Sequence, residues 1–518
     1  MPLPAPTPSN SKTLVWCSIA VGLFVAGVRV FLVGRWAGGT PYLDECNATG
    51  LLHIHASSSP FGIPWSWLVY PHMEHWLMTQ RLYSLAVAAC NAHQWDVRVE
   101  LIVGALSWGG LAAMLAALGG KYLHGIGLLG WSLLIVCAEA IPHAWENLLW
   151  AFQIQFLLLI VLSLLALRGL TAHPPFSLKW FCGVLAGVAA SASQASGLLA
   201  FAAAAVATAL LVRQRTPGTR LRAICGALVL GGCAAATVAM LPPAPWHERI
   251  HAHDLGTWLR TVEELLGWPW SRHAWMAILL WSPGAIFAFR LITGRTVVTP
   301  ANSFWLSVLT WSAAQIAAAA WARGSVLVLD VPPSRYAEIL VIGALANAWV
   351  VFRCWESAAW GRSSVRRTAF ACGWTAMLIT GIAVYAERAS NTGSIAGTIN
   401  RFSRADFVAS RPLHAEAYRK FEISGDPSAL EVDPPIYPNT RDLAEIIVKL
   451  KTAGRWPATL DSQSVRVVPL LSRIAARPEP LAWLLFGLAA IAGSYAVATR
   501  KHDLGAGWRG SARIPDPE

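Results

Sequence analysis

Charged side chains are scarce in this chain. Asp, Glu, Lys and Arg make up 13% of its 518 residues, whereas hydrophobic residues make up 55%. So few charges cannot cover the surface of a soluble particle of this length. The composition therefore argues against a soluble globular protein and predicts an all-α polytopic membrane protein.

Several sequence signatures are also lacking. The chain contains no P-loop, no dinucleotide-binding glycine fingerprint after a strand, no C-x-x-C pair and no G-x-S-x-G element. These absences argue against the nucleotide-binding and hydrolase classes that such motifs mark. No internal repeat with a period of about 20 to 50 residues is visible, which argues against a solenoid or an array.

Long apolar windows recur along the chain instead. A hydrocarbon layer needs about 17 to 25 residues of helix, and in lipid each backbone amide must be satisfied within its own segment. The sequence predicts twelve such helices, at 14–33, 101–118, 124–141, 148–168, 178–195, 197–212, 223–242, 274–292, 304–322, 335–352, 368–386 and 481–499. The polar patch at 191–197 fits either a tight turn or a bend in one long tilted helix.

Lys and Arg predict the orientation of these helices, because basic loops resist translocation. If the N-terminus is cytoplasmic, nearly all short-loop cations fall inside, and the outer short loops 142–147 and 323–334 contain only Arg323. The net charge of +12 then reflects topology, and no nucleic-acid partner is needed to explain it. We expect a bacterial inner-membrane protein with both termini cytoplasmic.

This topology divides the chain into a cytoplasmic tail (1–13), a transmembrane core (14–386) with a long outer loop (34–100), an extracytoplasmic segment (387–480), a last span (481–499) and a second cytoplasmic tail (500–518). The 387–480 segment is too long for a linker. Its turn residues and its amphipathic stretch "RDLAEIIVKLKTAG" predict a small α+β or mostly helical cap over the membrane cavity.

The outer loop begins with "GGTPYLDECNATG", which places two carboxylates just after the first helix. Nucleotide sugars and ATP are absent on the outer face, so chemistry there needs a substrate already carried across, such as a lipid-linked one. Asp44 is the first candidate for a general base, because the adjacent Glu45 can raise its pKa. Glu45 is the reserve candidate. The alternative is that Asp44 only caps a surface helix or turn.

The same loop continues with "PHMEHWLMTQRLY" (71–83), whose pattern predicts an amphipathic helix in the membrane interface. Glu74, His75 and Arg81 are its candidates for contact with an acceptor or a phosphate, or for orienting the loop. His and carboxylate ligands also suit a divalent metal, which remains an alternative, and no other cofactor is indicated. The run "WHERIHAHD" (246–254) would complete such a metal site or form a solvated face.

Three further sets of residues stand out. Arg335 and Tyr336 follow "DVPPS" at the start of a span. An Arg beside a helix N-terminus suits the phosphate of a donor substrate. The alternative is that the Arg335 side chain extends to the lipid headgroups.

Arg29 and Glu139 lie inside apolar spans, so they pair with each other or line the outer cavity with Glu146 and Asn147. Cys46 and Cys90 lie in the long outer loop, as a disulfide or as two free thiols.

The chain resembles the GT-C superfamily of integral-membrane glycosyltransferases, in particular bacterial members with an acidic first outer loop. The likeness rests on five segments: "YLDE", "PHMEHWLMTQRLY", "PHAWENLLWAFQIQF" (142–156), "SQASGLLAF" (193–201) and "SRYAEI" (334–339). It implies a GT-C-like fold, a polyprenyl-phosphate-sugar donor, an acceptor hydroxyl on a glycan, lipid or protein, and a first-loop carboxylate as base. Glycosyl transfer itself requires a carboxylate for the acceptor proton and cations for the leaving phosphate.

Two other classes share the predicted topology. A transporter or lipid-linked glycan flippase would also have many spans and basic inner loops, but it often has internal repeats and paired broken helices, which this sequence does not show. A glycan polymerase or ligase would use the same donor type and transfer a whole oligosaccharide.

Overall fold

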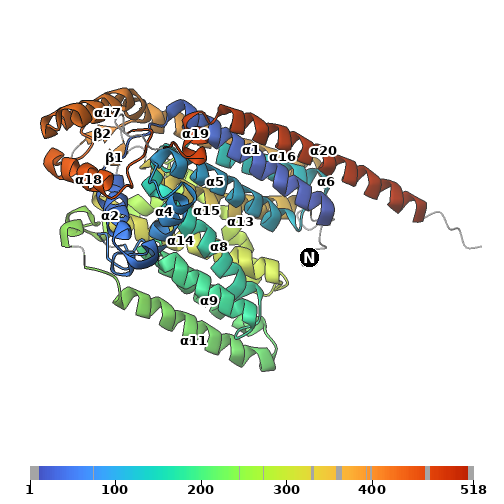
Figure 1. Ribbon diagram of the computed structural model, residues 1–518. Helices are drawn as coiled ribbons and strands as arrows, with labels where there is room; N and C mark the ends of the chain where they lie inside the picture. The colour runs from blue at the N-terminus through green and yellow to red at the C-terminus, as the bar shows by residue number, and fades with distance from the viewer. Residues whose placement is uncertain are drawn as a thin grey trace, which may run out of the picture.

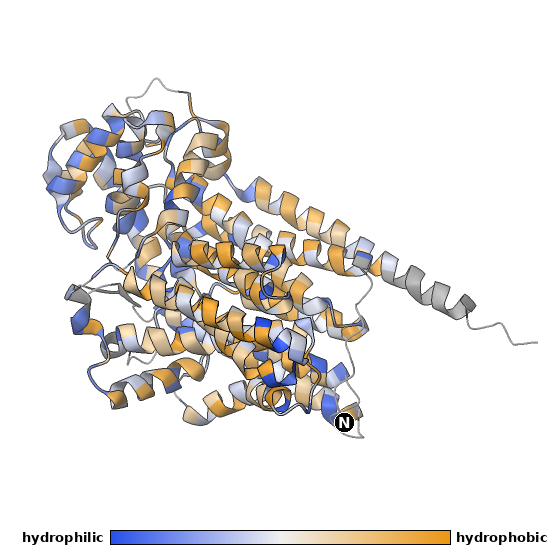
Figure 2. Cartoon of the chain, turned by 90° about the horizontal axis from the view of Figure 1, so that it is seen from below, coloured by the Kyte–Doolittle hydropathy of each residue, from blue (hydrophilic) through white to orange (hydrophobic). Residues whose placement is uncertain are grey.

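The computed structural model of the protein describes residues 11–73, 75–243, 245–271, 273–327, 332–356, 364–391, 394–396, 400–460 and 467–510. These residues form a bundle of long helices with a smaller helical cap at one end (Figure 1). Hydrophobic residues dominate the bundle, and hydrophilic residues gather in the cap (Figure 2).

Eight helical segments in the described ranges are long and apolar enough to cross a membrane, as expected of a polytopic helical membrane protein. They are α1 (Ser11–Trp36), α5 (Val97–Gly120), α8 (Ile154–Ala172) with the preceding turn η3 (Ala151–Gln153), α11 (Pro217–Ala239), α13 (Ala274–Ile292), α15 (Ser334–Glu356), α16 (Ser364–Asn391) and α20 (Glu479–Gly510). The predicted number of twelve spans is not confirmed.

Each of the other four predicted spans coincides with a helix that falls short of the length or the apolarity of a span. Three apolar helices are short: α6 (Gly125–Ala140), α9 (Leu178–Ser191) and α10 (Leu199–Leu210) with its leading turn η4 (Ala195–Leu198). The fourth, α14 (Pro300–Leu327), has 28 residues but is not among the eight apolar ones. It buries polar side chains, namely Asn302, Ser303, Ser307, Ser312 and Gln315.

The polar patch between α9 and α10 is a tight turn. Gln194 is extended, and the chain turns back so sharply that a Cβ at Gly197 would lie 2.1 Å from the carbonyl oxygen of Ala190. Only glycine fits this approach, so the two segments cannot join into one long helix.

Small residues allow α1 to pack closely at one side of the bundle. The Cβ of a residue replacing Gly22 would lie 2.8 Å from Ala113 of α5, and one replacing Gly27 would lie 2.8 Å from the ring of Phe486 in α20. Close backbone approach through small residues is a common way to associate helices in membranes. α15 lies deepest, with 94% of its apolar window buried.

The outer loop is folded into short elements. They are η1 (Glu45–Gly50), α2 (Leu51–Ser57), η2 (Pro60–Gly62), α3 (Trp65–Leu68) and α4 (Met78–Cys90). The predicted interfacial helix over 71–83 is wrong in its first half, because α4 begins at Met78. Met73 and Leu77 have left-handed φ values of 53° and 52°, which a helix cannot contain, and the Leu77 side chain is buried in the protein.

The cap is mostly helical, with one short ribbon. It contains β1 (Ser394–Ala396), β2 (Asn400–Phe402), α17 (Arg404–Ser424), η9 (Pro427–Leu430), α18 (Thr440–Thr452) and α19 (Leu470–Ala476). The remaining helical segments connect the spans: α7 (Trp145–Leu149), η5 (Val212–Gln214), η6 (Pro245–Ile250) and α12 (Leu255–Leu266).

Backbone hydrogen bonds dock the cap on the outer loop. The Leu43 amide donates to the Ile436 carbonyl at 3.0 Å, and the Trp95 amide donates to the Arg455 carbonyl at 2.9 Å. Tyr418 also donates its hydroxyl to the Pro41 carbonyl at 3.1 Å. The two segments therefore form one layer at the same end of the bundle (Figure 1).

Candidate functional site

Asp44 lies at the start of η1 with its carboxylate partly open to solvent. Its side chain is 30% exposed, and Oδ1 lies 3.7 Å from Nε2 of His72, which is 16% exposed. The His72 ring in turn contacts Phe152 of η3 edge-on, with ring centroids 5.5 Å apart. A carboxylate beside an imidazole on an accessible surface is able to accept a proton from a bound hydroxyl group.

Glu45 faces the opposite way and is buried, with 1% of its surface exposed. Oε2 accepts the Tyr42 amide hydrogen at 2.9 Å, and Oε1 accepts that of Ala151 at 2.7 Å. Burial raises the pKa of Glu45 to about 8, although Arg411 acts to lower it. One oxygen thus holds the turn at Tyr42 and the other joins the outer loop to η3, which favours a structural role over catalysis.

Arg411 of the cap supports the same junction. Its guanidinium donates to the Thr40 carbonyl at 3.3 Å and to the Leu149 carbonyl at 3.1 Å. Burial lowers the pKa of Arg411 to about 10, and the nearby Glu45 opposes this shift. The cap therefore supplies a buried cation under the outer loop, a residue that the sequence analysis did not single out.

Arg335 and Glu146 form the next layer. Arg335 Nη1 lies 3.3 Å from Glu146 Oε1, and its side chain is 20% exposed. Glu146 Oε2 accepts the Ser334 hydroxyl and the Arg335 amide, each at 2.9 Å, so this carboxylate caps α15. Asn147 donates to the Arg335 carbonyl at 3.0 Å. Glu146 therefore already occupies the N-terminus of α15, where the sequence analysis predicted a phosphate. A phosphate could then contact only the Arg335 side chain at this position.

These layers converge near Asp44. Asp44 and Glu146 both lie close enough to Arg335 for their charges to interact with it. The pKa of Tyr42 depends on the same charged groups. Burial raises this pKa to about 12 and Arg411 opposes the shift. The carboxylates of Glu45, Asp44 and Glu146 raise it further. The fold thus brings Asp44, His72, Glu146 and Arg335 into one region at the end of the bundle that the cap covers. Tyr336 packs beside it, edge-on to Phe156 at 5.9 Å.

Arg29 and Glu139 pair inside the bundle, as one of the two sequence hypotheses proposed. Arg29 Nη2 lies 3.5 Å from Glu139 Oε2 and 2.7 Å from Glu338 Oε1. Glu338 Oε2 is also 3.6 Å from Nε2 of the buried His143. Since Glu338 follows Arg335 by three residues on α15, this charged cluster lies about one helical turn below the Arg335–Glu146 pair.

The remaining loop candidates have mainly local contacts. Arg81 is 1% exposed, and its Nη1 donates to the backbone carbonyls of Trp67, Leu68, Tyr70 and Trp76. Burial lowers the pKa of Arg81 to about 10. His75 Nδ1 accepts the Ala195 amide hydrogen at 3.2 Å, and Glu74 lies outside the described residues. This geometry favours loop organisation over substrate contact for Arg81.

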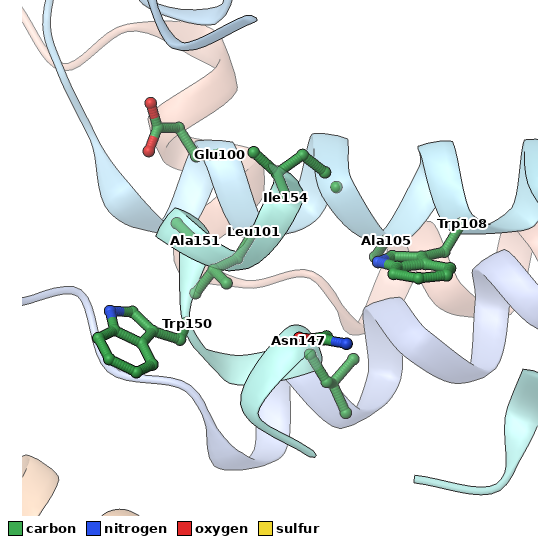
Figure 3. Close-up of a pocket in the computed structure, with 10 residues that line it drawn as sticks. Glu100, Leu101, Ala105, Trp108, Asn147, Trp150, Ala151 and Ile154 are labelled. Carbon is green, nitrogen blue, oxygen red and sulfur yellow. The ribbon is translucent and has the colours of Figure 1, made fainter. Parts of the chain in front are cut away.

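A narrow void lies between α5 and the segment from α7 to α8, and its lining includes Ala151, the residue whose amide hydrogen Glu45 accepts. Its volume is about 10 Å³. Trp108 and Trp150 lie at its two ends and Asn147 lies between them (Figure 3). Such a void has room for about one water molecule.

The metal and disulfide alternatives have no support in the described ranges. No group of three or more His, Cys, Asp or Glu side chains converges there, and the side chain of His247 is not described. Asp254 instead caps α12 by accepting the Thr257 amide hydrogen at 2.8 Å. Cys46 is buried and Cys90 is exposed, and both are free thiols.

Comparisons with protein families, with characterised proteins and with solved structures found no match for this chain.

Proposed function

We propose that the protein is a membrane glycosyltransferase that moves a sugar from a polyprenyl-phosphate-linked donor to an acceptor hydroxyl on the outer face of a bacterial inner membrane. The observation that supports this proposal most is the accessible Asp44 carboxylate beside His72, with Arg335 in electrostatic range. It combines a base with a cation, which are the two groups that this transfer requires.

In this mechanism the acceptor oxygen attacks the anomeric carbon of the donor sugar. Its proton passes to Asp44 while the new C–O bond forms. The bond between the anomeric carbon and the phosphate oxygen breaks, and the polyprenyl phosphate leaves with the electron pair. Arg335 stabilises the charge on that phosphate. No second carboxylic acid is required, because phosphate is a weakly basic leaving group.

A cavity in the cap suits the acceptor. It has a volume of about 520 Å³ and is lined by Glu431, Asp433 and Tyr437, among other residues. Tyr437 lies close enough to Asp44 for their charges to interact. Carboxylates and a phenol can accept and donate hydrogen bonds to the hydroxyl groups of a glycan. The cap would therefore orient the acceptor above Asp44.

The test is a transfer assay with purified protein and a panel of polyprenyl-phosphate sugars, using a synthetic glycan acceptor and mass detection of the product. Asp44→Asn should lower kcat by about 10²-fold or more, because the amide cannot accept the proton. Arg335→Gln should mainly raise KM for the donor. A folded Asp44→Asn protein that transfers sugar at the parental rate would refute this mechanism.

The buried cluster of Arg29, Glu139, Glu338 and His143 favours one other function. Ionisable groups inside a bundle are typical of proton and ion pathways in transporters. Solute or proton flux in proteoliposomes, abolished by Glu338→Gln without any transferase activity, would support that alternative.

A further inference from the structure

Two adjoining cavities lie at the end of the bundle where α1 begins, away from the outer loop and the cap (Figure 1). The larger has a volume of about 1170 Å³ and lies between α1, α6 and α20. Its walls include Phe24 of α1, Leu133 of α6 and Val497 of α20, and most of the other lining residues are also apolar. It exceeds the roughly 300–1,000 Å³ that is usual for small-molecule sites.

The position of this groove follows from the ends of the helices. It is lined by the first half of α1, from Thr13 to Phe24, and by the middle of α20, from Phe486 to Ala498. At this end Thr13 Oγ1 and Thr499 Oγ1 are 3.2 Å apart and hold the two helices together. α1 and α20 run side by side here, with α6 next to them (Figure 1).

The second cavity is smaller and more polar. It has a volume of about 490 Å³ and is lined by Trp355, Glu356, Arg367 and Thr368, together with His124 and Gly125. The last two residues line the apolar groove as well. The two spaces therefore adjoin each other at His124 and Gly125, with the polar compartment beside one end of the apolar groove.

Cations outnumber carboxylates around the polar compartment. Glu356 accepts the His124 amide hydrogen at 2.6 Å and lies 3.8 Å from Arg353 Nη1, so protein groups already balance its charge. Arg353 also donates to the Tyr122 carbonyl at 2.7 Å, and Lys121 Nζ lies 5.5 Å from the Tyr122 ring centroid. Arg353 and Lys121 lie near the compartment without lining it, whereas Arg367 lines it and donates from Nη1 to the Trp355 carbonyl at 3.5 Å. With the charge of Glu356 balanced, this arrangement favours an anion beside Arg367.

We propose that the joined cavities are a binding site for an anionic glycerophospholipid, with its acyl chains in the groove between α1, α6 and α20 and its phosphate beside Arg367. An apolar space of this size does not hold water, so in a bilayer alkyl chains must fill it. Basic pockets between transmembrane helices on the cytoplasmic side select anionic headgroups. The proposal does not depend on the glycosyltransferase function, because the site lies at the opposite face.

Native mass spectrometry of the detergent-purified full chain, titrated with phosphatidylglycerol or phosphatidylcholine of equal chain length, tests the site. We expect the wild-type protein to retain one phosphatidylglycerol more tightly than phosphatidylcholine, by about fivefold. Arg367→Gln should remove this preference while leaving total lipid binding similar. The neighbouring Arg366→Gln, an exposed position that does not line the compartment, should retain it.

Two groove variants test the acyl-chain part. A side chain at Gly493, which lines the groove, meets no atom within 4 Å, so Gly493→Leu should fill the space and reduce retention of both lipids. Gly487→Leu is the matched control, since it is equally open but outside the groove. Leu133→Trp fills the groove from α6 if the α20 variant folds poorly. Equal retention of both lipids by the wild-type protein, or equal losses in Gly493→Leu and Gly487→Leu, would overturn the proposal and leave only general annular lipid.

Discussion

At the scale of single residues, Asp44 and Glu45 illustrate how adjacent carboxylates acquire different roles. Asp44 keeps 30% of its side chain exposed beside His72, whereas Glu45 is buried and accepts two backbone amide hydrogens. Because Glu45 is only 1% exposed, an acceptor hydroxyl group from outside cannot reach its oxygens. The site proposal therefore depends on Asp44, and Glu45 becomes a residue that holds the loop in position.

Glu45 should make stability depend on pH. Its pKa is raised from 4.5 to about 8 by burial, so the folded state binds the proton more tightly than the unfolded state does. The resulting stabilisation is complete below about pH 4.5 and is lost as pH rises through about 8. We expect Tm in detergent to fall between pH 5 and 8.5.

The variant Glu45→Gln should flatten this pH dependence. It should also cost about 1–3 kcal/mol at low pH, because its amide group cannot accept one of the two hydrogen bonds. Glu445→Gln, which removes a carboxylate that is 69% exposed, is the control and should keep the parental slope. An unchanged slope in Glu45→Gln would show that another group titrates.

At the scale of elements, the outer loop is organised around one buried cation. The segment from Trp67 to Trp76 has little regular structure, yet four of its carbonyls accept hydrogen bonds from Arg81 Nη1. These hydrogen bonds explain why the segment before α4, which the sequence predicted as part of an amphipathic helix, is not helical. They also place His72 next to Asp44, since His72 lies within the segment.

Arg81→Met should therefore loosen the loop without unfolding the bundle. The loss leaves several buried carbonyls without their donor, at a cost of about 3 kcal/mol or more. Hydrogen exchange should become faster in residues 65–77 and remain unchanged in α15. Arg419→Met, which removes an exposed cation from α17, should have no such effect. Protection of 65–77 equal to that of the wild type would mean that other contacts hold the loop.

At the scale of the whole molecule, the polar layer of outer loop and cap lies at the opposite end of the bundle from the start of α1. The outer loop and the cap share one end, and the Thr13–Thr499 contact holds the start of α1 against α20 at the other. If the Lys and Arg bias sets orientation, the cap is extracytoplasmic.

Reporter fusions test this orientation. A phosphatase that is active only outside the cytoplasm should be active when fused after Ala429 in the cap and silent when fused after Gly218 at the start of α11. A cytoplasm-dependent fluorescent reporter at the same two sites should give the reverse pattern and serves as the control. Phosphatase activity at Gly218 would invert the topology and remove the basis for an outer-face substrate.

The sequence by itself determined that this is a helical membrane protein, because apolar content and window length depend only on composition and order. It also located a helix at each predicted span, and it singled out Arg29 with Glu139 because unpaired charges are costly in lipid. The number of spans could not be predicted from the sequence, since α6, α9 and α10 are shorter than the apolar windows that contain them.

Only the tertiary structure decided which polar groups meet. Glu338 completes the Arg29 cluster, Arg411 reaches the outer loop from a distant segment, and Glu146 caps α15. Each contact joins residues more than one hundred positions apart, and no local pattern encodes such a distance. Burial in the folded chain then separates Asp44 from Glu45, because hydration and hydrogen-bond partners are properties of position in space and not of order along the chain.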